Sequence, residues 1–497
     1  MTATACAALF IAFYALAPLV AARAGRPFET LGTRVVYTAP LLLFVFPVIA
    51  RIEPAVESPL LFGTMFLLLA LLAWRALATP EPALYFVAAF FGVGAEAAWS
   101  ATHLVADRLG AAVALYTAFG VFYLGVPLVA RRLGRPLEPR WGAGAVLMAS
   151  LGLLLFLASG SHAAAALWGL ALLLAILDAG LFIESASGGL PMLSAAGAGL
   201  SWIVLAVWWG NAAAVVGLLP SLLVLVGLTL VMLAGHAWAH AGMQRSRGAG
   251  DRTTPFGFQH GIYLGLVGHL FLFFVVQSPE WAIPPWPVFG ALAVLTLAVS
   301  VASLFVEAGV LHAAGAIAAA VIVFGWTAIS LQESWAPEAL VAAETTIAYA
   351  LGWLSIARRA DRTAASVGAV CALFIGELTV IAASRSGGAP PLAVVTLVHV
   401  VNLSLILVLA WTRQWPWIAP AAVAPAWLAT FAWHEYHPEP AAWKGALALA
   451  ASLYAVFAAY PFILGRRACD TRDPHLTTVV GSVFLFFAAR SAFLRGG

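Results

Sequence analysis

Charged side chains are scarce in this sequence. Asp, Glu, Lys and Arg together make up 9% of the 497 residues, whereas about a quarter of the residues in a typical soluble domain are charged. Hydrophobic residues reach 63%, and apolar runs of membrane-spanning length recur from Thr4 to Phe493 with only short polar breaks. No segment is left that would fold as a soluble domain with its own core. The sequence therefore predicts an all-α polytopic integral membrane protein, with the lipid bilayer as its main partner.

Other absences narrow the class further. The three cysteines, Cys6, Cys371 and Cys469, lie far apart and form no CxxC pair, so we expect no disulfide. The net charge of +3 is spread over many loops, which excludes the clustered basic face that nucleic-acid binding requires. The first apolar run is followed, and not preceded, by its arginines, the reverse of a cleavable signal peptide. We therefore expect a retained first span and no nucleic-acid partner.

Apolar runs of about 20 residues, the length that crosses a bilayer, predict eighteen transmembrane helices with short loops. Eighteen arginines fall in the odd-numbered loops, whereas the even-numbered loops hold only Arg51, Arg108, Arg385 and Lys444. By the positive-inside rule, the odd loops are cytoplasmic and both termini face the periplasm of a bacterial inner membrane. The predicted spans lie near 3–22, 34–52, 59–78, 83–102, 110–130, 141–159, 163–183, 191–209, 213–238, 258–277, 285–306, 309–330, 338–357, 364–384, 390–411, 415–433, 442–464 and 475–493.

Parts of the chain resemble one another. The runs from Ser58 and from Pro390 each place a tryptophan at the cytoplasmic end of one predicted span, Trp74 or Trp411, and a W-x-x-x-H motif at the outer end of the next. A weaker third copy begins at Leu219. Copies six spans apart predict parallel six-helix repeats related by an axis along the membrane normal. The alternative is that Ala- and Leu-rich spans resemble one another by composition alone. The predicted repeat units are 1–160, 161–330 and 331–497, with no soluble domain.

Three segments, LVHVVNLSLILVLAWTRQWPW, FAWHEYHPEP and AETTIAYALGWLSIARR, combine short-looped spans with arginine-bearing turns and an aromatic and acidic corner that ends in Pro-Glu. In these features the chain resembles a bacterial family of predicted many-pass membrane proteins, domain-of-unknown-function family 2339. Members of that family often carry extra N-terminal sequence with a polar segment, which this sequence lacks. The resemblance implies a many-pass membrane topology, and it implies no activity, cofactor or site residue.

Three acidic residues, Glu96, Glu344 and Glu377, fall inside predicted spans. An ionisable group in hydrocarbon costs roughly 2.5–3.5 kcal/mol on insertion scales, so each is expected to face the bundle interior, a partner or water. Glu344 and Glu377 lie in the outer halves of consecutive antiparallel spans, and Arg385 follows Glu377 at the outer end. The functional interpretation is a proton or cation relay open to the outside. The alternative is a protonated or hydrogen-bonded glutamate that fixes helix packing.

The histidines raise a haem hypothesis. His236 and His240 are four residues apart on one helical face, and His260 opens the next predicted span at a similar depth. Bis-histidine ligation of haem needs imidazoles from two helices at one level. An interfacial histidine without a ligand is the commoner case, and the sequence has no CxxCH motif. No cofactor is therefore assigned.

The outer ends of two predicted spans are rich in aromatic and ionisable residues, namely Trp99, His103, Trp433, His434, Glu435 and His437. The segment HEYH differs from the zinc motif HExxH, although an i, i+3 histidine pair can also share a helical face. One hypothesis is a zinc site formed by His434 and His437 with Glu435, Glu439 or His103. The commoner alternative is an amphipathic corner whose aromatic residues anchor the spans at headgroup level. No metal site is assigned.

These observations favour a non-enzymatic transporter or a lipid- and amphiphile-handling protein. Eighteen spans with few polar residues suit an apolar or amphipathic cargo better than a sugar or an ion, because water-filled paths need more polar lining. One alternative is a structural or scaffold subunit that assembles with other membrane subunits, and another is a haem- or metal-dependent membrane enzyme. A transporter predicts a cavity lined by Glu96, Glu344 or Glu377, whereas a scaffold predicts a molecule packed throughout.

Overall fold

The computed structural model describes most of the chain. All regular secondary structure in the described residues is helical, and the chain divides into two compact units, Met1–Gly265 and Leu266–Gly497. Arg247, Arg252, Arg358 and Arg359, which belong to the predicted charge asymmetry, and Cys469 lie outside the described residues. The described residues are 2–26, 28, 34–52, 58–79, 81, 83–246, 257–329, 335–356, 361–385, 388–437, 439, 442–468 and 471–496.

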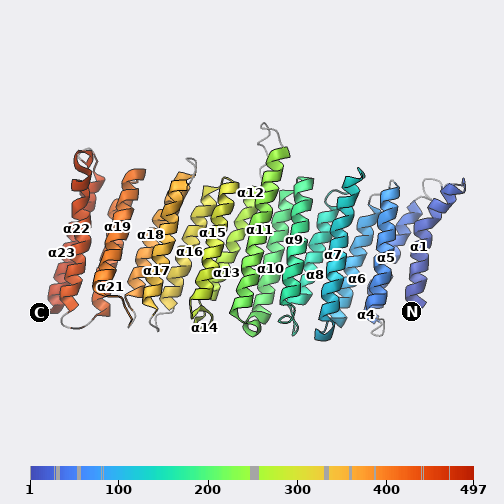
Figure 1. Ribbon diagram of the computed structural model, residues 1–497, viewed down its shortest axis with the longest axis horizontal. Helices are drawn as coiled ribbons and strands as arrows, with labels where there is room; N and C mark the ends of the chain where they lie inside the picture. Colours follow the sequence, from blue (N-terminus) through green and yellow to red (C-terminus); the bar gives the residue numbers. More distant parts are fainter. Residues whose placement is uncertain are drawn as a thin grey trace. The chain divides into compact units, whose positions relative to one another are not determined.

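In the first unit, long helices alternate in direction along the chain (Figure 1). Its elements are α1 (Thr2–Arg23), η1 (Arg34–Tyr37), α3 (Thr38–Leu42), α4 (Val45–Ile52), α5 (Ser58–Ala78), α6 (Leu84–His103), η2 (Ala106–Arg108), α7 (Leu109–Arg132), α8 (Gly142–Ala158), α9 (Leu167–Gly188), α10 (Pro191–Val216), α11 (Leu218–Ser246) and α12 (Phe258–Gly261). The 3-10 helix η3 (Ile262–Leu266) contains the dividing line between the units.

The second unit has the same helical character (Figure 1). Its elements are α13 (Val267–Val275), α14 (Pro279–Ala282), α15 (Trp286–Phe305), α16 (Gly309–Ile329), α17 (Ala336–Ile356), α18 (Arg362–Ala383), α19 (Leu392–Arg413), α20 (Ile418–Ala421), α21 (Val423–Tyr436), α22 (Ala442–Leu464), η4 (Gly465–Ala468) and α23 (Asp473–Gly496).

Sixteen helices in the described residues are long and apolar enough to cross a membrane. Helices suit this sequence because a bilayer offers no water to unpaired backbone groups, and a helix satisfies those groups within one segment. The chain is therefore a multi-pass membrane protein, as its composition predicts. Two of the eighteen predicted spans are not among these sixteen helices, because neither forms one helix of sufficient length. Span 141–159 forms the 17-residue helix α8, and span 415–433 is divided between α20 and α21.

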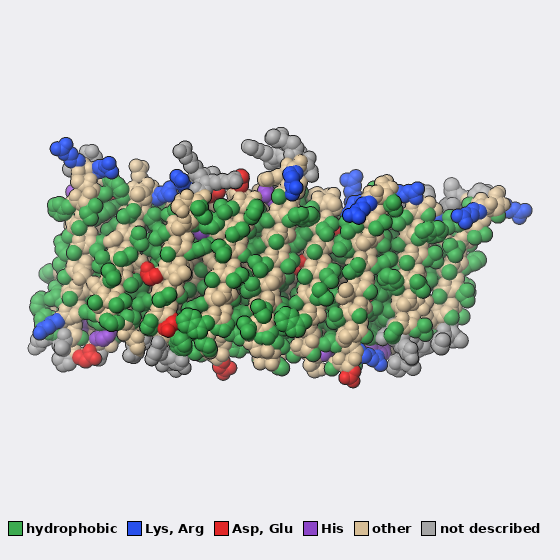
Figure 2. Space-filling view, in the orientation of Figure 1, with side chains coloured by type: hydrophobic (Ala, Val, Ile, Leu, Met, Phe, Trp, Pro, Cys, Tyr) green, Lys and Arg blue, Asp and Glu red, His purple; other side chains and the backbone are tan. Residues whose placement is uncertain are grey.

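Arginines gather at one end of the helices in each unit (Figure 2). In the first unit, Arg23, Arg75, Arg131 and Arg245 lie in the last turns of α1, α5, α7 and α11. These helices are all odd-numbered spans, so they run in the same direction. The described arginines thus follow the predicted alternation. That this end faces the cytoplasm remains a prediction.

The same tryptophan contact is made on two predicted spans that are four apart. In α10, Trp208 donates its indole N–H to the carbonyl oxygen of Ala163 at 2.8 Å, and in α16, Trp326 donates to Ala282 at 3.0 Å. Two further tryptophans, at 99 and 433, lie near the ends of α6 and α21. The four tryptophans fall on the fourth, eighth, twelfth and sixteenth predicted spans.

The turns that precede three of these spans are also alike. Gly189, Glu307 and Gln414 follow α9, α15 and α19 with φ of 65°, 55° and 55°. In each case the next residue donates its backbone N–H to the carbonyl five residues earlier, at 2.9, 3.0 and 2.9 Å. This is the left-handed helix cap that glycine favours, and it is kept here even with Glu or Gln at the left-handed position.

The tryptophan contacts on the eighth and twelfth spans are four spans apart, whereas the predicted repeat has six. The cap does not define a period, because Arg26 and Arg135 make the same bond after Gly25 and Gly134, at the ends of α1 and α7. The similar runs from Ser58 and Pro390 are twelve spans apart, and twelve is a multiple of both numbers. Their similarity in sequence therefore does not distinguish the two periods. The three six-helix repeats and their two boundaries stay predictions, and the spacing of the two tryptophan contacts is compatible with a shorter period.

Close approach of helices depends on small residues, as is usual where lipid surrounds a bundle. Gly368 of α18 lies against Ala313 of α16, and a Cβ atom at 368 would come within 2.8 Å of the Cα atom of Ala313. Backbone cannot move aside as a flexible side chain can. Gly368 therefore sets how closely α16 and α18 pack.

We predict that Gly368→Ala lowers the free energy of unfolding by about 1–3 kcal/mol, the usual cost of overpacking. Gly352→Ala on α17 is the matched control, because a Cβ atom there meets nothing within 4 Å. Thermal unfolding of the purified protein in detergent measures both. Equal melting temperatures for the two variants would show that the α16–α18 contact does not limit stability.

Candidate functional site

A group of polar side chains, buried except for the half-buried Glu344, joins α17, α18 and α19. His399 Nδ1 lies 2.5 Å from Glu377 Oε2, and the two side chains are 1% and 0% exposed. Asn402 Nδ2 donates to Glu344 Oε1 at 2.9 Å. His399 and Asn402 are three residues apart on α19, so they share one helical face and reach both acids. We call Glu344, Glu377, His399 and Asn402 the acid–histidine cluster.

The local sequence explains why the helices meet at this level. Gly376 precedes Glu377 on α18, and a Cβ atom at 376 would come within 2.5 Å of the side chain of Ile347 on α17. Ile347 is three residues after Glu344, so both lie on the same face of α17. The missing side chain at Gly376 therefore lets α17 approach α18 beside the cluster.

The cluster can hold a proton in more than one place. When the proton of the hydrogen bond between His399 and Glu377 is on the carboxyl group, both side chains are neutral. When it is on the imidazole, the pair is an imidazolium and a carboxylate, and the total charge is the same. Glu377 Oε1 and Asn402 Oδ1 are buried and make no hydrogen bond within the described part of the chain. Both atoms accept hydrogen bonds, so they suit water, a protonated carboxyl or a cation.

Other buried acids pair separately, each across two adjacent helices. Glu96 of α6, predicted as a site residue, is 1% exposed and accepts a hydrogen bond from Tyr123 of α7 at 2.9 Å. Ser201 of α10 donates to the carboxyl group of Asp178 of α9. Glu96 lies in the first unit and outside the acid–histidine cluster.

Arg385 does not join the cluster. Its guanidinium carbon lies 5.2 Å from the ring centre of Tyr436, a cation–π contact just past the C-terminal end of α18. Glu377 and Glu344 are instead linked through α19, where His399 bonds to the first and Asn402 to the second.

In both W-x-x-x-H corners the tryptophan and histidine rings lie nearly parallel, at different separations. Trp99 stacks on His103 with ring centres 6.4 Å apart and planes at 14°, and Trp433 stacks on His437 at 3.8 Å and 18°. His434 is buried at the same corner and Glu435 is exposed. Among the described residues, no group of three or more His, Cys, Asp or Glu is placed to hold a metal ion. Trp99 and Trp433 are buried, at 3% and 8% exposed, and the anchoring role of these corners stays a prediction.

The predicted haem histidines face different surroundings. His236 Nδ1 lies 2.9 Å from the carbonyl oxygen of Met232, and a Cβ atom at Gly261 would come within 2.2 Å of His236 Nε2. His240 Nε2 lies 2.8 Å from the side-chain amide of Gln244, and His260 Nδ1 accepts the backbone N–H of Gly257 at 3.0 Å. The backbone of α12 occupies the space that an iron bound to His236 Nε2 would need. His236 Nε2 therefore does not fit as an axial haem ligand, and a site at His240 with His260 stays a hypothesis.

No family model matches this chain. No curated protein matches it either. Four chains among the solved structures match, and one is described as a circular tandem repeat protein with novel repeat topology and enhanced subunit contact surfaces. That chain is 10% identical with a TM-score of 0.36, and the match covers 99% of this chain and 98% of that one. A likeness at this level carries no argument about function.

Sequence reasoning missed half of the cluster. His399 and Asn402 lie in LVHVVNLSL, where two polar residues at helical spacing interrupt an apolar run. That spacing was the available signal, since such a pair faces a neighbouring helix and not lipid. Asp178 was also missed, although it falls inside the predicted span 163–183.

We predict that His399→Ala lowers the free energy of unfolding by about 3–5 kcal/mol, because it leaves Glu377 buried without its partner. Glu377→Gln should cost less, since an amide still hydrogen-bonds to the imidazole. Thr412→Ala is the control on α19, because Thr412 is exposed and bonds only to carbonyls of its own helix. Thermal unfolding in detergent measures all three. If His399→Ala were no worse than Thr412→Ala, the pair would not stabilise the helix packing.

Proposed function

We propose that this protein is a transporter of the bacterial inner membrane that moves an apolar or amphipathic cargo and exchanges a proton at the acid–histidine cluster. The burial of Glu377 against His399, beside Glu344 and Asn402, is the observation that carries the proposal. Helix packing alone needs no such group, since an apolar side chain avoids the roughly 2.5–3.5 kcal/mol that an ionisable residue costs in hydrocarbon.

The placement of the cluster suits a coupling role. Its four side chains come from three consecutive helices, so adding or removing one proton changes the forces between all three. A proton at Glu377 or His399 also changes which atoms donate and which accept. Glu377 Oε1 and Asn402 Oδ1 lack a hydrogen-bond partner within the described residues. Both atoms can therefore accept a hydrogen bond from a donor that binds at the cluster.

The assignment to a bacterial inner membrane has separate support. The arginines gather at one end of the helices in each unit (Figure 2), as the positive-inside rule requires of a cytoplasmic side. The resemblance to domain-of-unknown-function family 2339 agrees with a bacterial many-pass protein. Neither observation concerns the cargo.

The proton site is tested by infrared difference spectroscopy of the protein in lipid nanodiscs during a pH titration. Wild-type protein should show buried carboxyl C=O bands that respond to the bulk pH, and Glu344→Gln and Glu377→Gln should each remove one component. This readout needs no cargo.

Asp178→Asn is the matched control, because Asp178 is a buried acid of the first unit with its own partner, Ser201. It should leave the bands of the cluster in place. Wild-type carboxyl bands that do not respond to pH, or bands that survive both glutamine variants, would overturn the proposal.

A further inference from the structure

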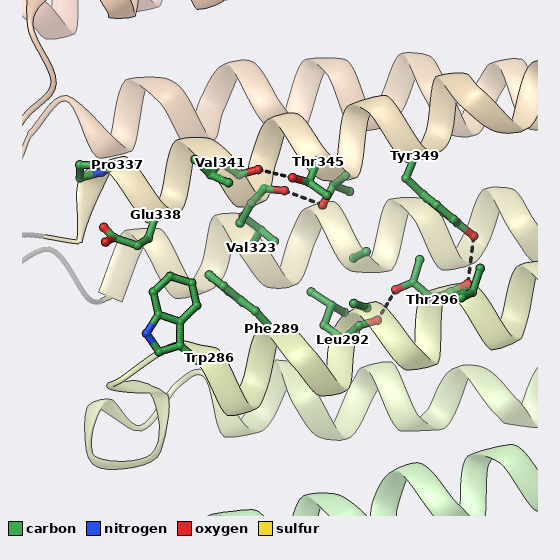
Figure 3. Close-up of a pocket in the computed structure, with 15 residues that line it drawn as sticks. Trp286, Phe289, Leu292, Thr296, Val323, Pro337, Glu338, Val341, Thr345 and Tyr349 are labelled. Carbon is green, nitrogen blue, oxygen red and sulfur yellow. Dashed lines mark hydrogen bonds between the residues drawn. The ribbon is translucent and has the colours of Figure 1, made fainter.

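Each unit has a groove between three of its helices. The first-unit groove lies between α5, α6 and α7 and measures about 580 Å³. The second-unit groove lies between α15, α16 and α17 and measures about 590 Å³ (Figure 3). Neither groove is lined by Glu96, Glu344 or Glu377, so neither is the cavity that the sequence predicts for a transporter.

The two grooves occupy equivalent places in the chain. The first groove falls on predicted spans three to five and the second on spans eleven to thirteen. The two grooves are therefore eight spans apart, twice the spacing between Trp208 and Trp326. In each, a phenylalanine packs edge-on against the recurring tryptophan: Phe62 on Trp99 at 5.7 Å, and Phe289 on Trp326 at 4.9 Å between ring centres. The grooves are therefore two versions of one structural feature.

Their linings differ in polarity. The first-unit groove is lined by apolar and aromatic residues: Pro59, Phe62, Gly63, Phe66, Leu67, Trp99, Ala111, Ala114, Leu115, Ala118 and Phe119. The second-unit groove adds Glu338 and the hydroxyl groups of Thr296, Thr345, Thr346 and Tyr349. Each of these hydroxyls already donates to a backbone carbonyl. Glu338 is thus the polar group whose bonding is incomplete.

Glu338 is placed at one end of the second-unit groove, next to Trp286 (Figure 3). Its Oε2 atom is buried and makes no hydrogen bond to any described residue. Trp286 is 60% exposed, and its ring meets that of Trp335 edge-on at 6.5 Å. A carboxylate beside indole rings complements an ammonium group, which is attracted both by the negative charge and by the faces of the rings.

The rest of the groove suits an apolar chain. From Glu338 to Tyr349 the groove follows α17 for about 16 Å, at about 1.5 Å per residue. Its rim includes Leu297 and Val341, which are 55% and 67% exposed, so the groove is open along its side toward the lipid. A chain can therefore enter from the bilayer without its ammonium group crossing the hydrocarbon.

We propose that the second-unit groove binds an amphiphile with an ammonium headgroup, whose apolar chain lies along α15 and α17 and whose ammonium lies at Glu338 and Trp286. The claim that this amphiphile is the transported cargo rests on the transport function proposed above. The claim that the groove binds it rests on the groove alone. The ammonium belongs either to a membrane lipid or to a free lipophilic amine, and the chemistry recognised is the same.

The test is photo-crosslinking of the full chain in nanodiscs of an uncharged diacylglycerol glycolipid, which carries no ammonium group, with labelled peptides mapped by mass spectrometry. The probes carry a photoactivatable group in the chain and are an alkyltrimethylammonium, a phosphatidylethanolamine and an alkyl sulfate of the same chain length. Wild-type protein should be labelled on α15, α16 and α17 by an ammonium probe and about tenfold less by the alkyl sulfate, an ordinary margin for one charge contact. Labelling by phosphatidylethanolamine indicates a membrane lipid, and labelling by the alkyltrimethylammonium alone indicates a free amine.

Two variants and an internal reference complete the design. Ala293→Phe fills the groove from an exposed lining position and should abolish the labelling, whereas Val294→Phe, on the next and 45% exposed residue outside the lining, should not. Glu338→Gln should remove the preference for ammonium over sulfate. The first-unit groove has no charged lining residue, so it should show no such preference.

Equal labelling of Ala293→Phe and Val294→Phe, or equal labelling of wild-type protein by sulfate and ammonium probes, would overturn the groove assignment. Glu377→Gln should leave the labelling unchanged, because Glu377 does not line the groove. The two proposals therefore fail separately. Loss of groove labelling with intact infrared titration refutes the cargo class, and a silent titration with intact labelling refutes the proton role.

Discussion

A polar group inside a bilayer has no water to bond with, so it needs a partner on its own helix or on a neighbouring one. The backbone meets this requirement by forming helices across nearly all of the described chain. The acidic side chains meet it by pairing across adjacent helices, as Glu96 does with Tyr123, Asp178 with Ser201 and Glu377 with His399. The same constraint thus determines both the secondary structure and the positions at which the helices are fixed to one another.

Not every polar atom is satisfied in this way. Glu377 Oε1, Asn402 Oδ1 and Glu338 Oε2 are buried without a hydrogen bond among the described residues. Each is an acceptor, and all three lie in the second unit. The first-unit groove is apolar, and the buried Glu96 of that unit has Tyr123 as its donor. The groove and the acid–histidine cluster of the second unit therefore carry acceptors that a proton or a cation would complete.

Hydropathy was sufficient to predict the class and nearly all of the spans, because a run of about 20 apolar residues has few other uses. It failed where a helix is broken by local geometry. Gly217, with φ of 92°, ends α10, so the ninth span begins at Leu218 and not at 213. The repeat was harder to predict, because the best-matched copies are twelve spans apart and fit periods of four and of six.

The site was only partly predictable for a different reason. A lone acid in an apolar run is visible in the sequence, and Glu344 and Glu377 were found in this way. Their partners were not, because the pairing is set by the rotation of α19 about its axis and by the room that Gly376 leaves for Ile347. Glu338 was not singled out, since only the structure places it at the end of an apolar groove, with a buried oxygen that makes no hydrogen bond to a described residue.

The most direct measurement is ¹⁵N solid-state NMR of histidine-labelled protein in lipid bilayers, with the His399 signal assigned by its absence in His399→Gln. If the cluster exchanges a proton with the solution, the ring nitrogens of His399 change their protonation across a pH titration, and Glu377→Gln alters that change. A His399 signal that stays constant with pH and is unaffected by Glu377→Gln would contradict a proton-exchanging pair and leave Glu377 and His399 as a packing contact.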